Sequence, residues 1–392
     1  MTSIVFYFEI HQPFRLKPYS FFKIGSDPFY QDDLKNSEVL YKVAHKCYMP
    51  ATQMLLDMIH RYDGRFRVTF SISGTALEQF ESWTPEVLDQ FRKLSETGCV
   101  EFLTETYYHS LAGLIDDEEF RIQVKMHQDI MERLLGVKPT AFRNTELIYN
   151  NHIAWLAKEM GFKSILLEGA KSVLDWRSPN FLYRARYEPD LICHLKNYTL
   201  SDDVAFRFSQ RSWSEFPLSA EKYSHWVHRY AGGAEVINLF MDFETFGEHQ
   251  WEDTGIFDFM RALPEMIFRH PDFHFHTVSE SARLYSTVGD IDTDWPVSWA
   301  DEERDVSAWL GNAIQNTAFN AVYELGHTIK EKGRDDLLHI FRKLQTSDHF
   351  YYMCTKFFND GDVHKYFSPY ESPYDAYIYY MNILQDLRQR IG

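Results

Sequence analysis

The sequence predicts an α/β protein in which a barrel of parallel strands is followed by a helical part. Up to residue 290, strand-like stretches alternate with helical ones, which indicates a parallel sheet with right-handed crossovers. Many such units in a row are typical of a barrel. Beyond residue 290 the strand signals stop while helical periodicity continues. We therefore expect a barrel domain over residues 1–290 and a helical domain over residues 291–392.

The expected strands share a short run of β-branched and aromatic residues. They are Ile4–His11, Phe66–Gly74, Val100–Glu105, Thr140–Glu146, Ser164–Glu168, Ser201–Ser209 and Val236–Phe246. The segments between them show apolar residues at helical spacing, for example over residues 85–94, 116–135 and 152–160. Residues 290–305 are acidic and irregular, as in a linker, and helices are expected beyond it over residues 306–332, 334–344, 350–358 and 372–390.

Composition excludes several classes of partner. The 392 residues carry a formal net charge of −17, which disfavours binding to nucleic acid or to an anionic membrane and is compatible with a neutral polymer. Aromatic residues make up 17% of the chain, and tyrosine and tryptophan offer flat faces that suit sugar rings. The oligomeric state is left open.

The cysteine pattern and the first residues of the chain indicate in which cellular compartment we expect the protein. The 4 cysteines are scattered without a CxxC spacing, so they predict neither a disulfide framework nor a zinc knuckle. The first apolar run has no basic leader and contains Glu9, so we expect no signal peptide and no transmembrane segment. A cytoplasmic protein is the resulting expectation.

The stretch around which the chain is organised is VINLFMDFETFGEHQW, residues 236–251. Its apolar start reads as a strand buried on both faces, and it ends in the acids Asp242, Glu244 and Glu248. Acids at the carboxyl end of such a strand lie where α/β folds place their chemistry. Taken alone, this pattern is better explained by a solvated acidic loop after a strand, because charges after strands are common.

Other strands also end in polar residues, which favours a shared site. The ends carry His11, Glu105, His109, Arg143, Glu146 and Glu168. Burying charges costs free energy unless they are paired, so stability alone does not ask for this arrangement. One polar pocket at the rim of a barrel explains it.

Two carboxylates that face each other across such a pocket are the minimum equipment for glycoside hydrolysis. The sequence lacks GxSxG, Walker, GxGxxG and HExxH motifs. Metal binding by His11, His109 or the pair Asp202 and Asp203 would need a denser cluster of ligands than the sequence shows. We predict no metal and no cofactor.

These motifs resemble those of glycoside hydrolase family 57, in particular its α-amylase-like members. His11-Gln12-Pro13, Phe102-Leu103-Thr104-Glu105 and Asp242-Phe243-Glu244-Thr245-Phe246-Gly247 resemble the first, third and fourth conserved regions of that family. The segment of residues 73–78 matches the second region loosely, and Glu78 is only a possible pocket residue. Residues 309–312 and 347–350 resemble segments of the family's helical region near the active site.

The resemblance implies an incomplete seven-stranded (β/α) barrel followed by a C-terminal α-helical bundle that contributes to the active-site cleft. It also implies retaining hydrolysis of α-1,4-linked glucans, with Glu105 as nucleophile and Asp242 as general acid/base. His11 and Arg143 would then hold sugar hydroxyls. Trp251 and Trp309 would stack on sugar rings, although core packing explains either tryptophan as well.

Asp348 and His349 are further candidates for substrate binding, although a helical Asp-His pair is more often structural. Three alternative functions stay open. A 4-α-glucanotransferase or branching enzyme would use the same two acids. A glucan-binding protein without activity would not need them, and a polysaccharide deacetylase would need a His/Asp metal site.

Overall fold

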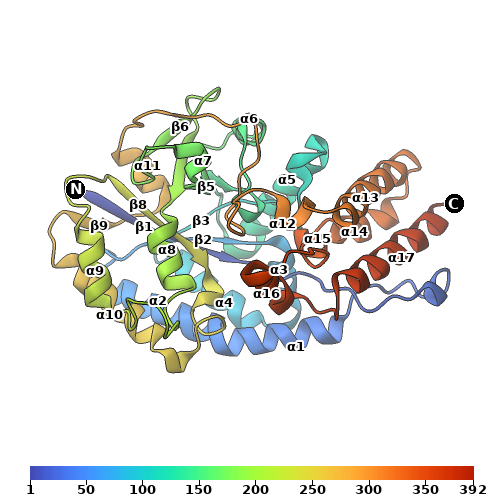
Figure 1. Cartoon of the computed structure of the whole chain (residues 1–392), viewed down its shortest axis with the longest axis horizontal. Coiled ribbons are helices and arrows are strands. Elements are labelled where there is room, and N and C mark those ends of the chain that lie inside the picture. The colour runs from blue at the N-terminus through green and yellow to red at the C-terminus, as the bar shows by residue number, and fades with distance from the viewer.

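A ring of parallel strands forms the centre of the molecule (Figure 1). The computed structural model describes the backbone of residues 1–392 and all side chains except those of residues 358–362. The ring consists of β1 (Thr2–Ile10), β2 (Val68–Ile72), β3 (Val100–Phe102), β4 (Ala141–Arg143), β5 (Ser164–Glu168), β7 (Ile192–Lys196) and β8 (Val236–Asp242). This arrangement confirms the predicted seven-stranded α/β barrel.

The number of backbone pairings between neighbouring strands differs around the ring. β1 pairs along most of its length with β8 and β2, up to the register pairs Glu9 with Asp242 and Ile10 with Ile72. Single bridges join β3 to β4, at Thr104 and Phe142, and β7 to β8, at Lys196 and Asn238. Since the strands run parallel, their carboxyl ends meet at one rim. Polar residues that are distant in sequence can therefore gather there.

One predicted strand is wrong. Residues 201–209 were expected to be extended, but α8 (Tyr198–Ala205) occupies their first half, and β7 takes the place in the ring. The Asn197 side chain accepts a hydrogen bond from the Leu200 N–H and caps the helix. The alternating Val204, Phe206 and Phe208 resemble a strand, yet Phe206 is 62% exposed.

Three further strands extend the sheet. β9 (Phe273–Phe275) pairs with β1, β6 (Tyr183–Ala185) lies antiparallel to β7, and β10 (Asp290–Ile291) pairs with β6. The helices around the ring are α1 (Asp33–Val43), η2 (Ala44–Tyr48), α2 (Met49–Arg61), α3 (Gly74–Trp83), α4 (Pro85–Glu96), α5 (Asp117–Leu135), α6 (Asn151–Glu159), α7 (Lys171–Leu174), α9 (Ala220–His228), α10 (Ile256–Phe268) and α11 (Val278–Leu284). Short 3-10 turns lie at η1 (Phe21–Lys23), η3 (Ala112–Leu114), η4 (Thr145–Leu147), η5 (Phe243–Thr245) and η6 (Glu252–Thr254).

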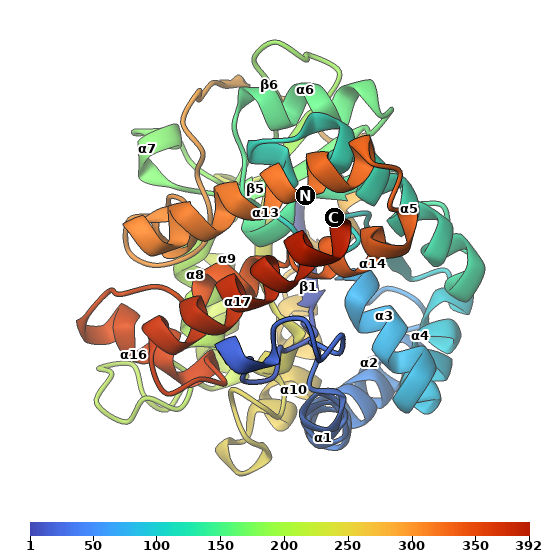
Figure 2. The ribbon, with the colours of Figure 1, turned by 90° about the vertical axis from the view of Figure 1, so that its right-hand side faces the viewer.

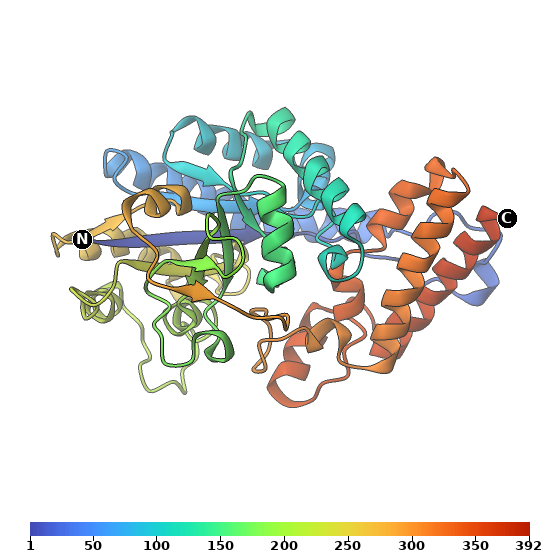
Figure 3. The ribbon, with the colours of Figure 1, turned by 90° about the horizontal axis from the view of Figure 1, so that it is seen from above.

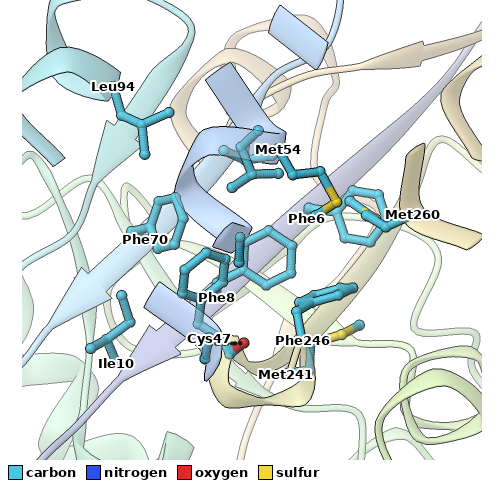
Figure 4. Close-up of a cluster of buried hydrophobic side chains, with 14 of the residues drawn as sticks. Phe6, Phe8, Ile10, Cys47, Met54, Phe70, Leu94, Met241, Phe246 and Met260 are labelled. Atoms are coloured by element: carbon cyan, nitrogen blue, oxygen red, sulfur yellow. Dashed lines mark hydrogen bonds between the residues drawn. The ribbon is translucent and has the colours of Figure 1, made fainter. Parts of the chain in front are cut away.

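Alternate residues of each strand face different cores, as expected for strands covered on both sides. Phe6 and Phe8 of β1 point outward and pack with Met54 of α2 and Met260 of α10 (Figure 4). Tyr7, between them, points into the barrel, where its ring meets that of Phe240 at a centroid distance of 5.3 Å. The barrel interior is thus filled below the rim.

Helices alone follow β10 in the chain. They are α12 (Ser307–Leu310), α13 (Ala313–Glu331), α14 (Asp335–Lys343), α15 (Ser347–Tyr351), α16 (Phe358–Phe367) and α17 (Pro373–Ile391). The single helix predicted over residues 350–358 is wrong, because a turn and irregular backbone over residues 352–357 separate α15 from α16. The helical part lies across the end of the barrel toward which β1 runs (Figures 2 and 3). A boundary between two domains near residue 290 stays a prediction.

Several contacts join this helical part to the beginning of the chain, and two of them involve charged side chains of α15 and α17. Tyr30 donates a hydrogen bond to Asp386 of α17, and Asp348 of α15 pairs with His11 at 2.8 Å. The cysteines are free and buried. Within the described residues, every helix is too short or too polar to cross a lipid bilayer.

Trp309 lies in the hydrophobic core of the helical part and is 0% exposed. Its ring faces Tyr351 at a centroid distance of 6.2 Å. The expectation that Trp309 stacks on a sugar is therefore replaced by core packing, because a stacking residue needs an open ring face.

We predict that Trp309→Ala lowers the free energy of unfolding by about 3–5 kcal/mol, because it opens a cavity in a filled core. Trp251→Ala is the matched control. Trp251 is 57% exposed, so its loss should change stability by less than about 1 kcal/mol. Urea unfolding followed by circular dichroism measures both, and equal losses in the two variants would contradict the assignment of Trp309 to the core.

Candidate active site

Charged side chains lie at the carboxyl ends of most strands of the ring. They are Glu9, Glu105, Arg143, Glu168, Lys196 and Asp242. All except Asp242 are buried. The charged residues at the strand ends therefore gather at one rim, where all of them except Asp242 form ion pairs.

Glu105 follows β3 and is 0% exposed. One of its oxygens, Oε2, accepts a hydrogen bond from His109 Nδ1 at 2.8 Å, and Arg143 Nη1 is 3.8 Å from the same atom. Burial alone would raise the pKa of Glu105, but His109 and Arg143 outweigh it and lower this pKa to about 2. Glu105 is thus an anion at neutral pH. Its other oxygen, Oε1, has no hydrogen-bond partner among the described side chains.

His109 is the cation that holds Glu105. Its second ring nitrogen, Nε2, lies 3.2 Å from Glu146, and Nδ1 also lies 3.5 Å from Glu9. Burial disfavours the charged ring, yet the three carboxylates raise the pKa of His109 to about 10. Both nitrogens therefore donate. The backbone of His109 has a φ of 51°, a left-handed conformation that is costly for a non-glycine residue.

Glu9, Glu105 and His109 offer ligand atoms within 4.8 Å of one another, which raises the question of a metal ion. The donor set does not fit one. Arg143 is fully buried, pairs with Glu9 and lies beside Glu105, so its charge would repel a divalent cation. His109 carries protons on both nitrogens and has no lone pair to give.

Arg143 was expected to hold sugar hydroxyls. The structure instead directs its guanidinium at Glu9 and Glu105 and leaves the side chain 0% exposed. The correction has a simple cause, since a buried guanidinium needs carboxylates around it.

Asp242 ends β8 next to Glu9 in register. Burial raises its pKa, the charge of Glu146 adds to this, and the charges of His249 and Arg143 oppose it. A proton on Asp242 is thus favoured relative to an ordinary aspartate. The two predicted catalytic acids therefore lie at one rim with opposite preferences for a proton.

The turn after Asp242 is fixed against the π-helical turn η2. Tyr48 of η2 donates a hydrogen bond to Glu244, and Gln12 donates one to the Tyr48 hydroxyl at 3.0 Å. Gly247 has a φ of 112°, and a Cβ there would lie 1.9 Å from the Lys46 carbonyl oxygen. Only glycine fits this contact.

His11 lies beside the acids and is shared with the helical part. Its ring stacks on His109 at a centroid distance of 3.9 Å. Burial and the charge of His109 lower the pKa of His11, so the ring is neutral. Its Nε2–H donates to Asp348, and Nδ1 accepts from Ser73 at 2.8 Å. The structure thus places His11 and Asp348 beside the acids, and their role in substrate binding stays a prediction.

A second charged group lies across the rim from Glu105. Lys196 pairs with Asp202 at 2.9 Å and lies 3.8 Å from Glu168. Arg304 binds Glu168 at 2.7 Å and Asp202 at 3.4 Å. Asp202 therefore belongs to α8 and to this group, not to a strand.

The other predicted binding residues lie elsewhere. His349 is buried, its Nε2 contacts the Lys343 carbonyl at 3.1 Å, and burial lowers its pKa to about 4, so it is a structural residue. Glu78 accepts a hydrogen bond from Tyr107 and pairs with Lys343, outside the rim. Trp251 is exposed after β8, with Lys46 4.7 Å from its ring centroid.

Sequence reasoning gave no role to several residues of the site. Glu146 was recognised only as a polar strand end, and His109 was considered besides only as a metal ligand. Lys196 was missed because β7 was not predicted. Trp299 was missed because residues 290–305 resembled a linker, although a tryptophan within an acidic stretch is itself a signal.

Comparison with known proteins gives a consistent picture. A family model described as "Glycosyl hydrolase family 57" matches residues 5–294. A protein of Methanocaldococcus jannaschii described as "Putative alpha-amylase" is 44% identical over 402 residues, which cover 99% of this chain and 84% of that protein.

Solved structures share the fold at low sequence identity. The 4-alpha-glucanotransferase of Thermococcus litoralis superposes with a TM-score of 0.67 at 16% identity, over 89% of this chain and 56% of that one. The GH57-type branching enzyme of Pyrococcus horikoshii superposes with a TM-score of 0.69 at 14% identity, over 93% of this chain and 87% of that one.

The buried cation predicts a specific pH dependence. The pKa of His109 is raised to about 10, so its stabilising contribution is complete below about pH 6.5 and is lost as pH rises toward 10. We expect the free energy of unfolding to fall by roughly a few kcal/mol between pH 6.5 and pH 10.

His109→Gln should abolish most of this fall, since the variant has no charge to lose. Urea unfolding at pH 6, 8 and 10 compares the variant with the wild type. His152→Gln is the control, because His152 is exposed and pairs only with Asp117. A wild type and a His109→Gln variant with the same pH dependence would contradict the buried imidazolium.

Proposed function

This chain belongs to glycosyl hydrolase family 57, and we propose that within it the protein is a retaining hydrolase of α-1,4-linked glucans. The description of the relative from Methanocaldococcus jannaschii supports this choice of substrate. The net charge of −17 also suits a neutral polysaccharide.

The observation that carries the proposal is the opposite proton preference of two carboxyl groups at one rim. The pKa of Glu105 is lowered to about 2, whereas that of Asp242 is raised. A retaining glycosidase needs one ionised carboxylate and one protonated acid at the same time. Their surroundings supply this difference.

In the proposed mechanism, Glu105 Oε1 attacks the anomeric carbon, because Oε2 is occupied by His109. The bond to the leaving oxygen breaks as Asp242 gives that oxygen its proton. A covalent glycosyl ester on Glu105 results. Asp242, now ionised, takes a proton from a water molecule as the oxygen of that water bonds to the anomeric carbon. The ester bond to Glu105 breaks at the same time, and Glu105 leaves as a carboxylate.

The remaining residues would hold the substrate. The side chains of His11 and Asp348 are 12% and 21% exposed at the rim, so both would reach sugar hydroxyls through this exposed part. Trp251 lies outside the rim and is 57% exposed, so it would stack on a sugar only with the ring area that Lys46 leaves open.

We predict different products when azide is added to two variants. Glu105→Ala removes the nucleophile, so azide should attack the substrate from the face that Glu105 occupied and yield the inverted glycosyl azide. Asp242→Ala keeps the nucleophile, so an aryl glycoside should form the glycosyl-enzyme and azide should then give the retained product. Nuclear magnetic resonance identifies each anomer.

Without azide, each substitution should lower turnover by roughly a hundredfold or more. Asp258→Ala is the control, because this acid lies on the exposed side of α10. Exchanged anomers in the two variants would reverse the assigned roles. Turnover close to the wild-type rate in both would place the chemistry elsewhere.

Hydrolysis and transfer use the same two acids and differ in the group that intercepts the glycosyl-enzyme. We expect incubation with a single maltooligosaccharide to give only shorter products. Chromatography of the products decides this, and chains longer than the starting sugar would favour a transferase.

Activity should also survive exhaustive chelation with EDTA, since Arg143 pairs with Glu9 and lies beside Glu105, two of the three members of the only candidate donor set among the described residues. Loss of turnover that zinc restores would favour a metal-dependent deacetylase instead.

A further inference from the structure

Residues 292–306, which we name the strap, connect β10 to α12 and cross the rim of the barrel. The strap is held at its start by a bridge between Val297 and Tyr149, where each backbone N–H donates to the other carbonyl at 2.9 Å. The segment expected to be a linker is therefore an ordered part of the site.

Trp299 is the residue of the strap that reaches the candidate catalytic centre. Its indole Nε1–H donates to Glu146 Oε2 at 2.7 Å, and its backbone N–H donates to the Glu146 carbonyl at 3.2 Å. Glu146 in turn accepts from His109 at its other oxygen, Oε1. Trp299 is thus linked to Glu105 through two intermediates, Glu146 and His109.

Two cations, Arg143 and Lys196, also lie over the ring of Trp299. The Arg143 guanidinium carbon lies 5.1 Å from its centroid, and Lys196 Nζ lies 5.3 Å from it. Cation–π contacts of this kind are stronger where water is excluded. Arg143 belongs to the group around Glu105, and Lys196 belongs to the group around Glu168, so the indole lies between the two charged groups of the rim.

The backbone conformation at Glu146 needs stabilising contacts such as the hydrogen bonds from Trp299. Glu146 and Leu147 have φ values of 57° and 53°, two consecutive left-handed conformations in non-glycine residues. Each costs free energy and persists only where surrounding contacts impose it. The two hydrogen bonds from Trp299 are contacts of this kind.

The strap is itself fixed from both sides. Asp301 binds Lys356 at 2.8 Å and His364 at 3.0 Å, which attaches the strap to the helical part. Arg304 binds Glu168, which attaches it to the barrel. The position of the indole is therefore determined by both parts of the molecule.

We propose that Trp299 is a positioning residue of the catalytic centre: it holds Glu146, and through it His109, against Glu105, and it keeps Arg143 and Lys196 apart. It does not stack on substrate, because protein cations already use its ring. This inference rests on the proposed function for its kinetic consequence, but its structural part can be tested without activity.

The experiment compares Trp299→Phe with Trp299→Leu. Phenylalanine keeps a ring for the cations but loses the N–H donated to Glu146, and leucine loses both. Trp299→Phe should lower kcat by about tenfold on a maltooligosaccharide, with KM changed by less than about twofold. Trp299→Leu should lower kcat further. Trp295→Phe is the matched control, since Trp295 lies in the same strap and is 82% exposed.

A second measurement follows the titration of His109 by nuclear magnetic resonance of histidine labelled with nitrogen-15. In both Trp299 variants the midpoint should fall below the wild-type value, because Glu146 is released from His109. The groups that face His109 and set this midpoint are Glu9, His11, Glu105, Glu146 and Asp348. Trp295→Phe should leave it unchanged.

Several results would overturn the proposal. A large rise of KM at unchanged kcat in Trp299→Phe would assign the ring to sugar stacking. An unchanged kcat together with an unchanged His109 midpoint would reduce Trp299 to packing. If the wild type cleaves no glucan, the proposed function fails, and the His109 midpoint alone then decides the role of Trp299.

Discussion

The architecture of the site depends on the pairing of one buried cation, Arg143. Its guanidinium is fully enclosed, and an unpaired charge in such a place would cost several kcal/mol. Glu9 and Glu105 supply the counter-charge to Arg143. Because two carboxylates face one guanidinium, the charged ring of His109 balances the remaining negative charge at Glu105. Each of these strand ends is therefore held in place by the charges on its neighbours. The pairing of Glu105 with His109 and Arg143 is also the cause of its lowered pKa.

The barrel does not complete this site by itself. Its rim would be open to water, which would weaken every interaction between the charges. The helical part contributes Asp348 to His11, and the strap contributes Trp299 and Arg304 to the two charged groups of the rim. The segments that follow β10 therefore cover part of the rim and reduce the exposure of the paired charges to water.

The sequence predicted the barrel because alternating strand and helix signals are local, whereas the roles of Glu105 and Asp242 came from the resemblance of their motifs to a known family. A long apolar run that ends in Asp242 is visible without any tertiary information. The function of Arg143 was not visible, since exposure decides whether an arginine meets a sugar or a buried carboxylate. The strand β7 was missed because the alternating apolar residues of α8 resembled a strand more closely. Trp299 could not be placed because its partners, Glu146, Arg143 and Lys196, come from three other segments.

The pair formed by His11 and Asp348 joins residues that are 337 positions apart. Contacts of such long sequence separation form late, because a long loop must be closed before they contribute stability. During synthesis on the ribosome the barrel strands emerge well before residue 348, so the cover of the rim is made last. A chain arrested before residue 348 would lack the partner of His11 and would be an unfinished enzyme.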